Sequence, residues 1–457
     1  MRGGAYLSLR LGLGVALNFG GILLLTRAIG PESYGLYAIA LGIFMFLQYV
    51  TVWGVGVYLV RREGEDSAEA YHQGFTLLLL LGTVGTGLAV LGVPLLERWV
   101  TVEGFGPVAL AMFCSLPVVL LGKVPLARLE RALDYKKVAL FELSGLFAYY
   151  LAALPLAFHG AGATAPVAGW WAQQLLLVAL FFPGARYLPR LYWDGAEARR
   201  MIRYGLSFSA SMWVWQAREL VNPLVVGKFL GAEAAAYVDL AVRFVRGLSF
   251  VKEAMWRLSI AALGRIQRDR PRLVRAVSEG MKLQVIAQGP LLVGFGFFAF
   301  WFLPLVVGQR WGPVMEVYPF IALGFLVNAG FNLHSSALYV LQRNFDVVIF
   351  HLAHIALFAG TAFVLVPRLG LVGYGLAEVV ALTSYVVVHH YFVKEIGRPD
   401  YRIAGAWTVA LAMSLFIHEI GWWALIGLGA VALWPRTWRE IGGYASSMWN
   451  VWKAREA

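Results

Sequence analysis

Three arginines and two carboxylates stand inside apolar stretches in the second half of the chain. They are Arg218, Glu219, Asp239, Arg243 and Arg246. A charge that faces lipid costs about 2.5–3.5 kcal/mol on insertion scales, so such side chains face a partner or a water-filled cavity. The planar guanidinium fork binds two oxygens of a phosphate at once. Such arginines can bind an anion, and Glu219 and Asp239 can bind a cation.

The spacing of these residues puts the arginines at a similar depth. A turn is expected near Leu230, with Arg218 twelve residues before it and Arg243 thirteen residues after it. At 1.5 Å per residue, both arginines lie about 18–20 Å from the turn, close to the middle of a bilayer. Arg243 and Arg246 are three residues apart and share a helix face. Two guanidinium groups can therefore point into one cavity.

A structural explanation of the same charges stays open. Asp239 and Arg243 have the spacing of an ion pair on a helix surface. Glu219 can pair across the hairpin with Arg246 or Lys252. Three tryptophans nearby can stack on sugar rings or belong to packing and the membrane interface: Trp213, Trp215 and Trp256.

Other polar residues give weaker signals. His351 and His354 lie three apart with Asp346 nearby, which permits a metal or proton site, but no third ligand is evident and no metal is predicted. Glu378 is expected to be exposed at the membrane interface. Pro223 is expected to kink the helix that carries Arg218.

The elements that position these residues are membrane helices. Of 457 residues, 60% are hydrophobic and 14% charged, and the mean hydropathy is +0.69. In a soluble domain about a quarter of the residues are charged, which is well above the share in this chain. Runs such as Phe75–Leu96 can cross about 30 Å of hydrocarbon and do not alternate as barrel strands do. Since backbone groups find no water in the membrane, we predict an all-α polytopic membrane protein.

The composition also excludes several function classes. The net charge of +12 comes from basic residues in short loops, so it predicts membrane orientation rather than a nucleic-acid partner. Cys114 is the one cysteine, which rules out a disulfide framework. The longest loops, 185–204 and 257–279, are too short for an enzyme domain. We therefore predict no enzyme activity and no cofactor.

Apolar runs between charged breaks predict fourteen spans, or twelve if the last two form a re-entrant pair. Their approximate bounds are 5–26, 34–60, 74–96, 107–127, 139–158, 166–184, 205–226, 233–256, 280–306, 314–341, 347–366, 371–393, 403–420 and 421–435. With the N-terminus in the cytoplasm, inside segments hold 28 of the 38 Lys and Arg residues and outside segments hold 5. This bias predicts that both termini are cytoplasmic.

An internal repeat organises the spans. At an offset of 201 residues, LLLTRAIGPESYGLYAIA from Leu23 aligns with LVVGKFLGAEAAAYVDLA from Leu224, and Arg27 matches Lys228. In each segment a helix ends at a basic residue, a glycine forms the turn, and an acidic residue lies in the first turn of the next helix. Two pseudo-symmetric six-helix bundles follow, although any helical hairpin could share this pattern. The predicted domains are 1–184, a linker 185–204, 205–393, an added helix pair 403–435 and a cytoplasmic tail 436–457.

The first of these segments resembles a family signature. It is similar to R-x-L-G-P-E-x-Y-G-x-Y near the N-terminus of polysaccharide and O-antigen flippases, of the multidrug/oligosaccharidyl-lipid/polysaccharide exporter superfamily. The matching residues are Arg27, Gly30, Pro31, Glu32, Tyr34, Gly35 and Tyr37, with Ile29 in the leucine position. VPRLGLVGYGLAE from Val366 resembles the family's start of the twelfth span, and YVLQRNFDV from Tyr339 resembles its cytoplasmic turn.

The resemblance implies an alternating-access flippase of the bacterial inner membrane. Such a protein moves an undecaprenyl-diphosphate-linked oligosaccharide from the cytoplasmic to the periplasmic leaflet for cell-surface polysaccharide synthesis. The implied partners are this lipid-linked saccharide, bound at its pyrophosphate by Arg218, Arg243 and Arg246, membrane lipid, and H+ or Na+. A lipid II flippase and a multidrug antiporter of the same fold remain alternatives. The antiporter would prefer acidic cavity residues, whereas the charges here are mostly arginines.

Overall fold

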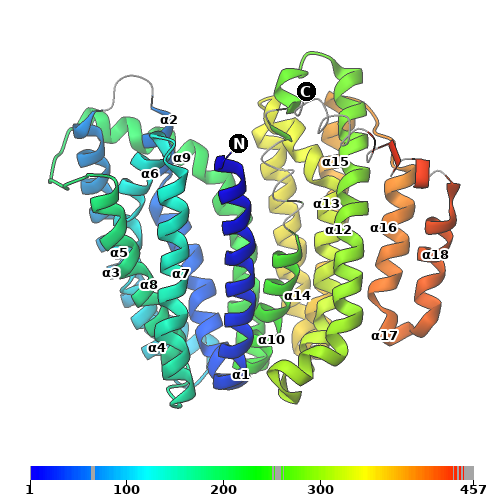
Figure 1. Cartoon of the computed structure of the whole chain (residues 1–457), viewed down its shortest axis with the longest axis horizontal. Helices are drawn as coiled ribbons and strands as arrows, with labels where there is room; N and C mark the ends of the chain where they lie inside the picture. The colour runs from blue at the N-terminus through cyan, green and yellow to red at the C-terminus, as the bar shows by residue number, and fades with distance from the viewer. Residues whose placement is uncertain are drawn as a thin grey trace. The chain divides into compact units, whose positions relative to one another are not determined.

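The structure is a computed structural model of the chain and consists of helices (Figure 1). It describes residues 2–62, 67–249, 252, 259, 260 and 262–435, and then 437–439, 442, 443 and 446. Over these ranges it has helices and no strand. The α-helices are α1 (Arg2–Val52), α2 (Val55–Arg61), α3 (Ala68–Val100), α4 (Phe105–Phe113), α5 (Leu116–Leu121), α6 (Lys123–Arg131), α7 (Tyr135–Phe158), α8 (Thr164–Gly184), α9 (Gly195–Ala217), α10 (Gly227–Leu248), α12 (Arg270–Val307), α13 (Val314–Val340), α14 (Asn344–Ala381), α15 (Tyr385–Glu395), α16 (Arg402–Leu415), α17 (Ile417–Ile420) and α18 (Ile426–Leu433).

Short 3-10 and π segments connect some of these helices. They are η1 (Arg218–Leu220), η2 (Asn222–Val226), η3 (Gln309–Trp311), η4 (Leu382–Ser384) and η5 (Gly421–Leu425). Only η2 is a π-helix.

Three of the long helices are broken at a glycine. Gly30 in α1 has φ 73° and ψ 171°, and Gly231 in α10 has φ 83° and ψ −171°. Gly370 in α14 has φ 60°. A positive φ costs glycine little, so each glycine can end one helix and begin the next. The predicted turns at Gly30 and near Leu230 are confirmed, and the two repeat glycines have nearly the same conformation.

The all-α polytopic membrane fold is confirmed. Within the described part of the chain, eight helices are long and apolar enough to cross a membrane. A ninth follows if Arg402–Leu415 and Ile417–Leu433, bent by 62°, form one span. Two of the eight contain the breaks at Gly30 and Gly370. Every predicted span contains helix within its described residues. The number of membrane spans, fourteen, stays a prediction.

The helices form two compact units. Unit 1 comprises Met1–Leu240, Leu303–Val314 and Ile355–Ala377, and unit 2 comprises Ala241–Phe302, Met315–His354 and Glu378–Ala457. Some helices therefore begin in one unit and end in the other. The predicted bundle and linker boundaries stay a prediction.

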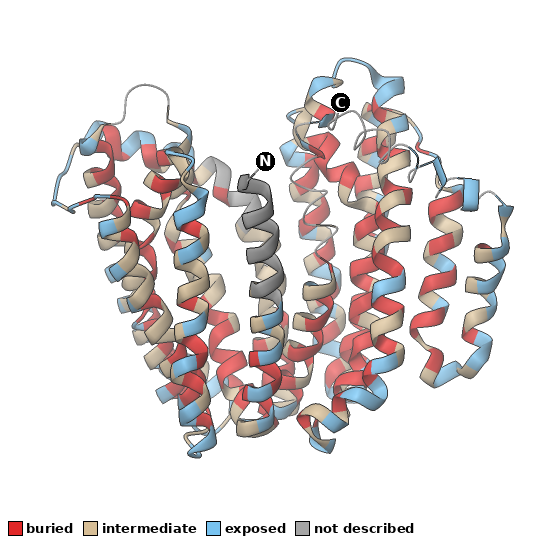
Figure 2. Ribbon diagram, in the orientation of Figure 1, coloured by how far each residue is buried: buried red, intermediate tan, exposed pale blue. Residues whose placement is uncertain are grey.

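One face of α3 exposes large apolar side chains, as expected for a helix surrounded by lipid. Leu88, Leu91 and Leu95 share one helix face and are 67%, 78% and 72% exposed. Figure 2 shows exposed and buried residues alternating around the long helices of each unit. Lipid covers such exposed leucines at no cost, so helices in a membrane associate through close packing rather than through the hydrophobic effect.

Close packing in unit 1 depends on glycines. A Cβ on Gly35 of α1 would overlap the backbone carbonyl of Ala232 in α10. A Cβ on Gly205 of α9 would overlap the carbonyl oxygen of Trp53, in the turn between α1 and α2. These glycines let backbones touch, as small residues do in membrane helix pairs. Close contacts thereby join the first half of α9 to the turn after α1, and α10, just after its break at Gly231, to α1.

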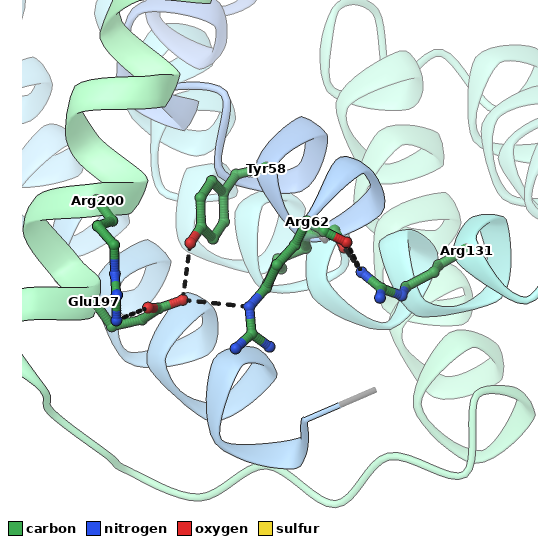
Figure 3. Close-up of polar contacts among 6 residues, drawn as sticks. Tyr58, Arg62, Arg131, Glu197 and Arg200 are labelled. Atoms are coloured by element: carbon green, nitrogen blue, oxygen red, sulfur yellow. Dashed lines mark hydrogen bonds and ion pairs between the residues drawn. The ribbon is translucent and has the colours of Figure 1, made fainter. Parts of the chain in front are cut away.

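A buried carboxylate fixes the beginning of α9 (Figure 3). Glu197 accepts a hydrogen bond of 3.0 Å from the hydroxyl of Tyr58 in α2. It forms ion pairs of 2.6 Å with Arg200 and 3.7 Å with Arg62, and its side chain is 9% exposed. The Tyr58 ring also meets the Tyr204 ring edge-on, with centroids 5.6 Å apart. A buried carboxylate of this kind needs such partners, because its desolvation is costly.

Arg131 ties a third helix to the same place. From the end of α6, its NH1 donates to the carbonyl oxygens of Leu59 at 3.2 Å and Arg62 at 2.8 Å (Figure 3). These carbonyls belong to the last turn of α2, where the helix itself supplies no donor. Together with Glu197, Arg131 joins the ends of α2, α6 and α9.

In unit 2, a tyrosine docks the C-terminal helix pair. The Tyr401 hydroxyl lies 2.6 Å from Nε2 of His334 and 2.8 Å from Nδ1 of His389. Burial raises the pKa of Tyr401, so its hydroxyl keeps its proton. It can therefore donate to one histidine and accept from the other. This joins the start of α16 to α13 and α15.

We predict that Glu197→Gln lowers the stability of the protein in detergent by about 1–3 kcal/mol, since it leaves Arg62 and Arg200 without their carboxylate. The measurement is the midpoint of thermal unfolding. Glu69→Gln is the matched control, because Glu69 is an exposed acid in the first turn of α3. An equal midpoint for both variants would contradict a stabilising role of Glu197.

We predict that Gly205→Ala is destabilising by about 1–3 kcal/mol, because the added methyl forces α9 away from the Trp53 carbonyl. Gly56→Ala is the control, since a Cβ there has no neighbour within 4 Å. The control should be neutral or stabilising by about 0.5–1 kcal/mol, as expected for alanine in a helix. Thermal unfolding compares the two, and equal stability would argue against a tight α9 contact.

Candidate functional site

The helix that carries the candidate site is interrupted next to it. After Ala217 the α-helix gives way to η1 and then to the π-helix η2, before α10 begins at Gly227. Pro223 lies in η2, and its ring supplies no backbone donor. A Cβ on Gly42 of α1 would lie 3.2 Å from Cγ of Pro223, so the interrupted segment packs closely on α1. The expected kink at Pro223 stays a prediction, but the residue lies in a π-helical segment, and such segments are frequent at functional sites.

Arg218 stands at the first residue of this interruption. Its guanidinium carbon lies 5.6 Å from the ring centroid of Trp215 and 5.6 Å from that of Phe358. The residue is half-buried, and its Nε is buried. Aromatic faces attract a cation without neutralising it. The guanidinium is thus within cation–π distance of two rings inside unit 1.

Asp239 has a hydrogen-bond partner from another helix. The Tyr34 hydroxyl, in α1, donates to its Oδ2 at 2.6 Å. Tyr34 is fully buried, and its ring meets that of Trp311 edge-on with centroids 5.7 Å apart. Glu219, the other predicted coupling residue, is half-buried beside Arg218.

Arg243 and Arg246 follow Asp239 along α10. Arg243 is half-buried and Arg246 is exposed. The three residues lie within two turns and share a helix face, as predicted. Arg218, Glu219 and Asp239 belong to unit 1, whereas Arg243 and Arg246 belong to unit 2. Arg218 and the two carboxylates thus lie in the same unit, and their meeting in one site, like the convergence of the three arginines, stays a prediction.

The tryptophans named with the site have different surroundings. Trp215 lies beside Arg218. Trp213 donates from its indole nitrogen to the carbonyl oxygen of Tyr49 at 2.7 Å, which is a helix-packing contact. Trp256 lies outside the described residues. Trp215 is therefore the tryptophan that the geometry associates with the site.

Two acidic residues differ from what the sequence indicates. Glu378 was expected at an exposed interface, but it is 1% exposed, so that expectation is wrong. Its carboxylate lies next to Gly324 of α13, where a Cβ would be 3.5 Å from Oε2. Glu197, described above, carried no sequence signal beyond its place in a loop. Only the packing of distant helices buries these two carboxylates.

The histidine pair in α14 does not gather a set of metal ligands. Nδ1 of His354 lies 2.9 Å from the Ser384 hydroxyl and 3.1 Å from the Ala381 carbonyl oxygen. Asp346 instead forms an ion pair of 2.7 Å with Arg343. Within the described ranges, no three His, Cys, Asp or Glu residues come together as metal ligands.

The chain is similar to known proteins in sequence. The profile of a family described as "Polysaccharide biosynthesis protein" matches residues 24–316. The succinoglycan biosynthesis transport protein ExoT of Rhizobium meliloti is 23% identical over 309 residues, which cover 67% of this chain and 62% of ExoT. This chain therefore matches less than two thirds of the length of that relative.

Two solved structures have the same fold. A lipid II flippase MurJ in an inward closed conformation superposes with a TM-score of 0.68 at 14% identity, over 92% of this chain and 96% of MurJ. An inward-facing multidrug transporter of the MATE family, from the MOP superfamily, superposes with a TM-score of 0.72 at 15% identity, over 84% of this chain and 94% of the transporter. At such identities the likeness concerns the fold.

The family match covers well over half of the chain. It includes the Arg27–Tyr37 signature and every candidate residue from Arg218 to Arg246. It therefore confirms the resemblance found in the opening hairpin. The chain belongs to the polysaccharide biosynthesis protein family.

Proposed function

We propose that the protein is a flippase that moves a lipid-diphosphate-linked oligosaccharide across the membrane by alternating access. The observation that carries this proposal is Arg218, which lies within cation–π distance of two aromatic rings at a helix interruption inside a polytopic bundle. Family membership and the name of ExoT as a transport protein support it. The substrate expected from the sequence is an undecaprenyl-diphosphate-linked oligosaccharide.

In this proposal the arginines bind the diphosphate. A guanidinium binds two phosphate oxygens in parallel, and a site with little water makes this attraction stronger than in solution. The sequence assigns Arg218, Arg243 and Arg246 to this role. Trp215, beside Arg218, offers a ring on which a sugar can stack.

The orientation of the protein in the membrane follows from the distribution of charge. Basic residues concentrate in the segments that share a side with the N-terminus. Under the positive-inside rule, both termini lie in the cytoplasm of a bacterial cell, and the turns at Gly30, Gly231 and Gly370 face the periplasm. The saccharide is then carried from the cytoplasmic to the periplasmic leaflet of the inner membrane.

Asp239 and Glu219 are the proposed coupling residues. A carboxylate inside a membrane bundle is costly, and it commonly marks a path for protons or cations. Tyr34 donates to Asp239, and binding of H+ or Na+ by the carboxylate would weaken this hydrogen bond. Binding of an ion at Asp239 would thereby change the contact between α10 and α1.

Two other functions fit the same fold. A lipid II flippase also binds a lipid diphosphate and differs in the saccharide. A multidrug antiporter would carry cations, and three arginines would repel them. The charge of the candidate site therefore favours an anionic substrate, and the family match favours the polysaccharide branch.

We predict that Arg218→Ala and Arg243→Ala each slow translocation about tenfold or more, because each removes a hydrogen-bonded charge from the diphosphate. The measurement is the movement of a fluorescent lipid-diphosphate oligosaccharide between leaflets of proteoliposomes. Arg218→Lys keeps the charge and loses the fork, so its rate should fall between those of the other forms. Arg368→Ala removes an exposed cation in a turn and is the control.

If neither alanine substitution changes the rate of translocation, the arginines do not form the substrate site, although the protein is still a flippase. No movement of any lipid-linked saccharide, combined with export of a cationic dye, would replace the proposed function by drug antiport.

We predict that Asp239→Asn abolishes the response of translocation to a pH or Na+ gradient, because the amide keeps the size of the side chain but takes up no proton and has no negative charge to attract Na+. The same proteoliposomes measure this with and without each gradient. Glu233→Gln, an exposed carboxylate earlier in α10, is the control and should keep the response. A normal gradient response in Asp239→Asn would assign coupling elsewhere.

A further inference from the structure

Two cations at the ends of helices each contact the end of a distant helix. NH1 of Arg27 donates to the carbonyl oxygens of Val306 at 2.8 Å and Leu305 at 3.4 Å, in the last turn of α12. Nζ of Lys228 donates to the carbonyl oxygen of Trp99 at 3.4 Å, in the last turn of α3. Both contacts lie inside unit 1.

The internal repeat relates these two contacts. Arg27 and Lys228 occupy matching positions, each three residues before a glycine turn, at Gly30 and Gly231. Arg27 ends the first predicted span and reaches the ninth, while Lys228 ends the seventh and reaches the third. Each half of the repeat therefore caps a helix of the other half. A chance surface contact would have no reason to occur twice at matching positions.

Physical chemistry favours both contacts. The last four carbonyl groups of a helix have no donor within the helix, and the helix dipole makes that end negative. A cation there satisfies a carbonyl and meets a favourable field. At the second contact the Lys228 ammonium also lies 3.7 Å from the centre of the Trp99 ring, and the Trp99 indole donates to the Leu224 carbonyl oxygen at 2.9 Å.

The same end of unit 1 is closed by direct backbone contact. Gly35, five residues after Gly30, touches the carbonyl of Ala232, one residue after Gly231. Leu303–Val314 and Ile355–Ala377, which flank the ends of later helices, belong to this unit as well. The two cations therefore hold the ends of α3 and α12 in the unit in which the two repeat segments touch at Gly35 and Ala232.

We propose that Arg27 and Lys228 are a pair of staples that hold this end of the transporter shut and release when it opens. The proposal rests on the flippase function above, since only an alternating-access protein needs this end to open. The charge distribution predicts that the end faces the periplasm. The staples then set how readily the outward-open form is reached.

A thiol reporter at the backbone contact tests this proposal. Ala232→Cys is placed in a Cys114→Ser background, because Cys114 is exposed. Ala232 is 6% exposed when the end is closed. A membrane-impermeant maleimide is added outside intact spheroplasts, and the labelling rate at position 232 reports opening. Protein amount and monodispersity in detergent show that each variant is folded.

Arg27→Ala and Lys228→Ala should each raise the labelling rate about two- to fivefold, the effect of removing a cation from a helix C-terminus. The double variant should show roughly the product of the two factors. Lys228→Arg should keep the slow rate, and Arg368→Ala is the matched exposed cation that should change nothing. Gly35→Ala should also raise the rate, because its methyl overlaps the Ala232 carbonyl.

If the labelling rate at position 232 is unchanged in Arg27→Ala and Lys228→Ala but raised in Gly35→Ala, the proposal that the two cations hold this end shut is refuted. Labelling only from the cytoplasmic side, in inverted vesicles, would overturn their proposed place at the outer gate. A raised rate in variants of a protein that moves no lipid-linked saccharide would refute the flippase function and leave the staples standing.

Discussion

The membrane interior offers no water to a polar group, and this constraint accounts for most of the structure. Backbone groups are satisfied within helices, so the described chain is helical throughout its spans. Each charge must find a partner in another segment. Asp239 accepts from Tyr34, and the Arg218 guanidinium carbon lies 5.6 Å from the ring centroids of Trp215 and Phe358. The polar contacts of the protein therefore also define which helices meet.

Glycine contacts and polar contacts act together on the α9–α10 segment. Gly205 and Glu197 fix its beginning, and Gly35 meets it just after the turn at Gly231. Between these points the helix departs from α geometry, and Arg218 stands where the departure begins. A helix that is held at both ends and interrupted between them can change its shape locally. This arrangement places the candidate site where a local change can reach both ends.

The sequence predicted features that depend on neighbouring residues. Apolar runs located the helices, and a cation followed by glycine and an acid located the turns at Gly30 and Gly231. It did not predict the burial of Glu378 or the bonds of Glu197, because helices far apart in the chain create those surroundings. For the same reason the sequence did not predict the carbonyl partners of Arg27 and Lys228, although the repeat aligned these two positions.

The central claim is that the protein carries an anionic lipid-linked saccharide. Its most direct test offers purified protein in liposomes two labelled substrates side by side, a lipid-diphosphate oligosaccharide and a cationic dye. The account predicts protein-dependent movement of the saccharide between leaflets, competition by unlabelled lipid diphosphate, and no movement of the dye. Transport of the dye without movement of the saccharide would contradict it.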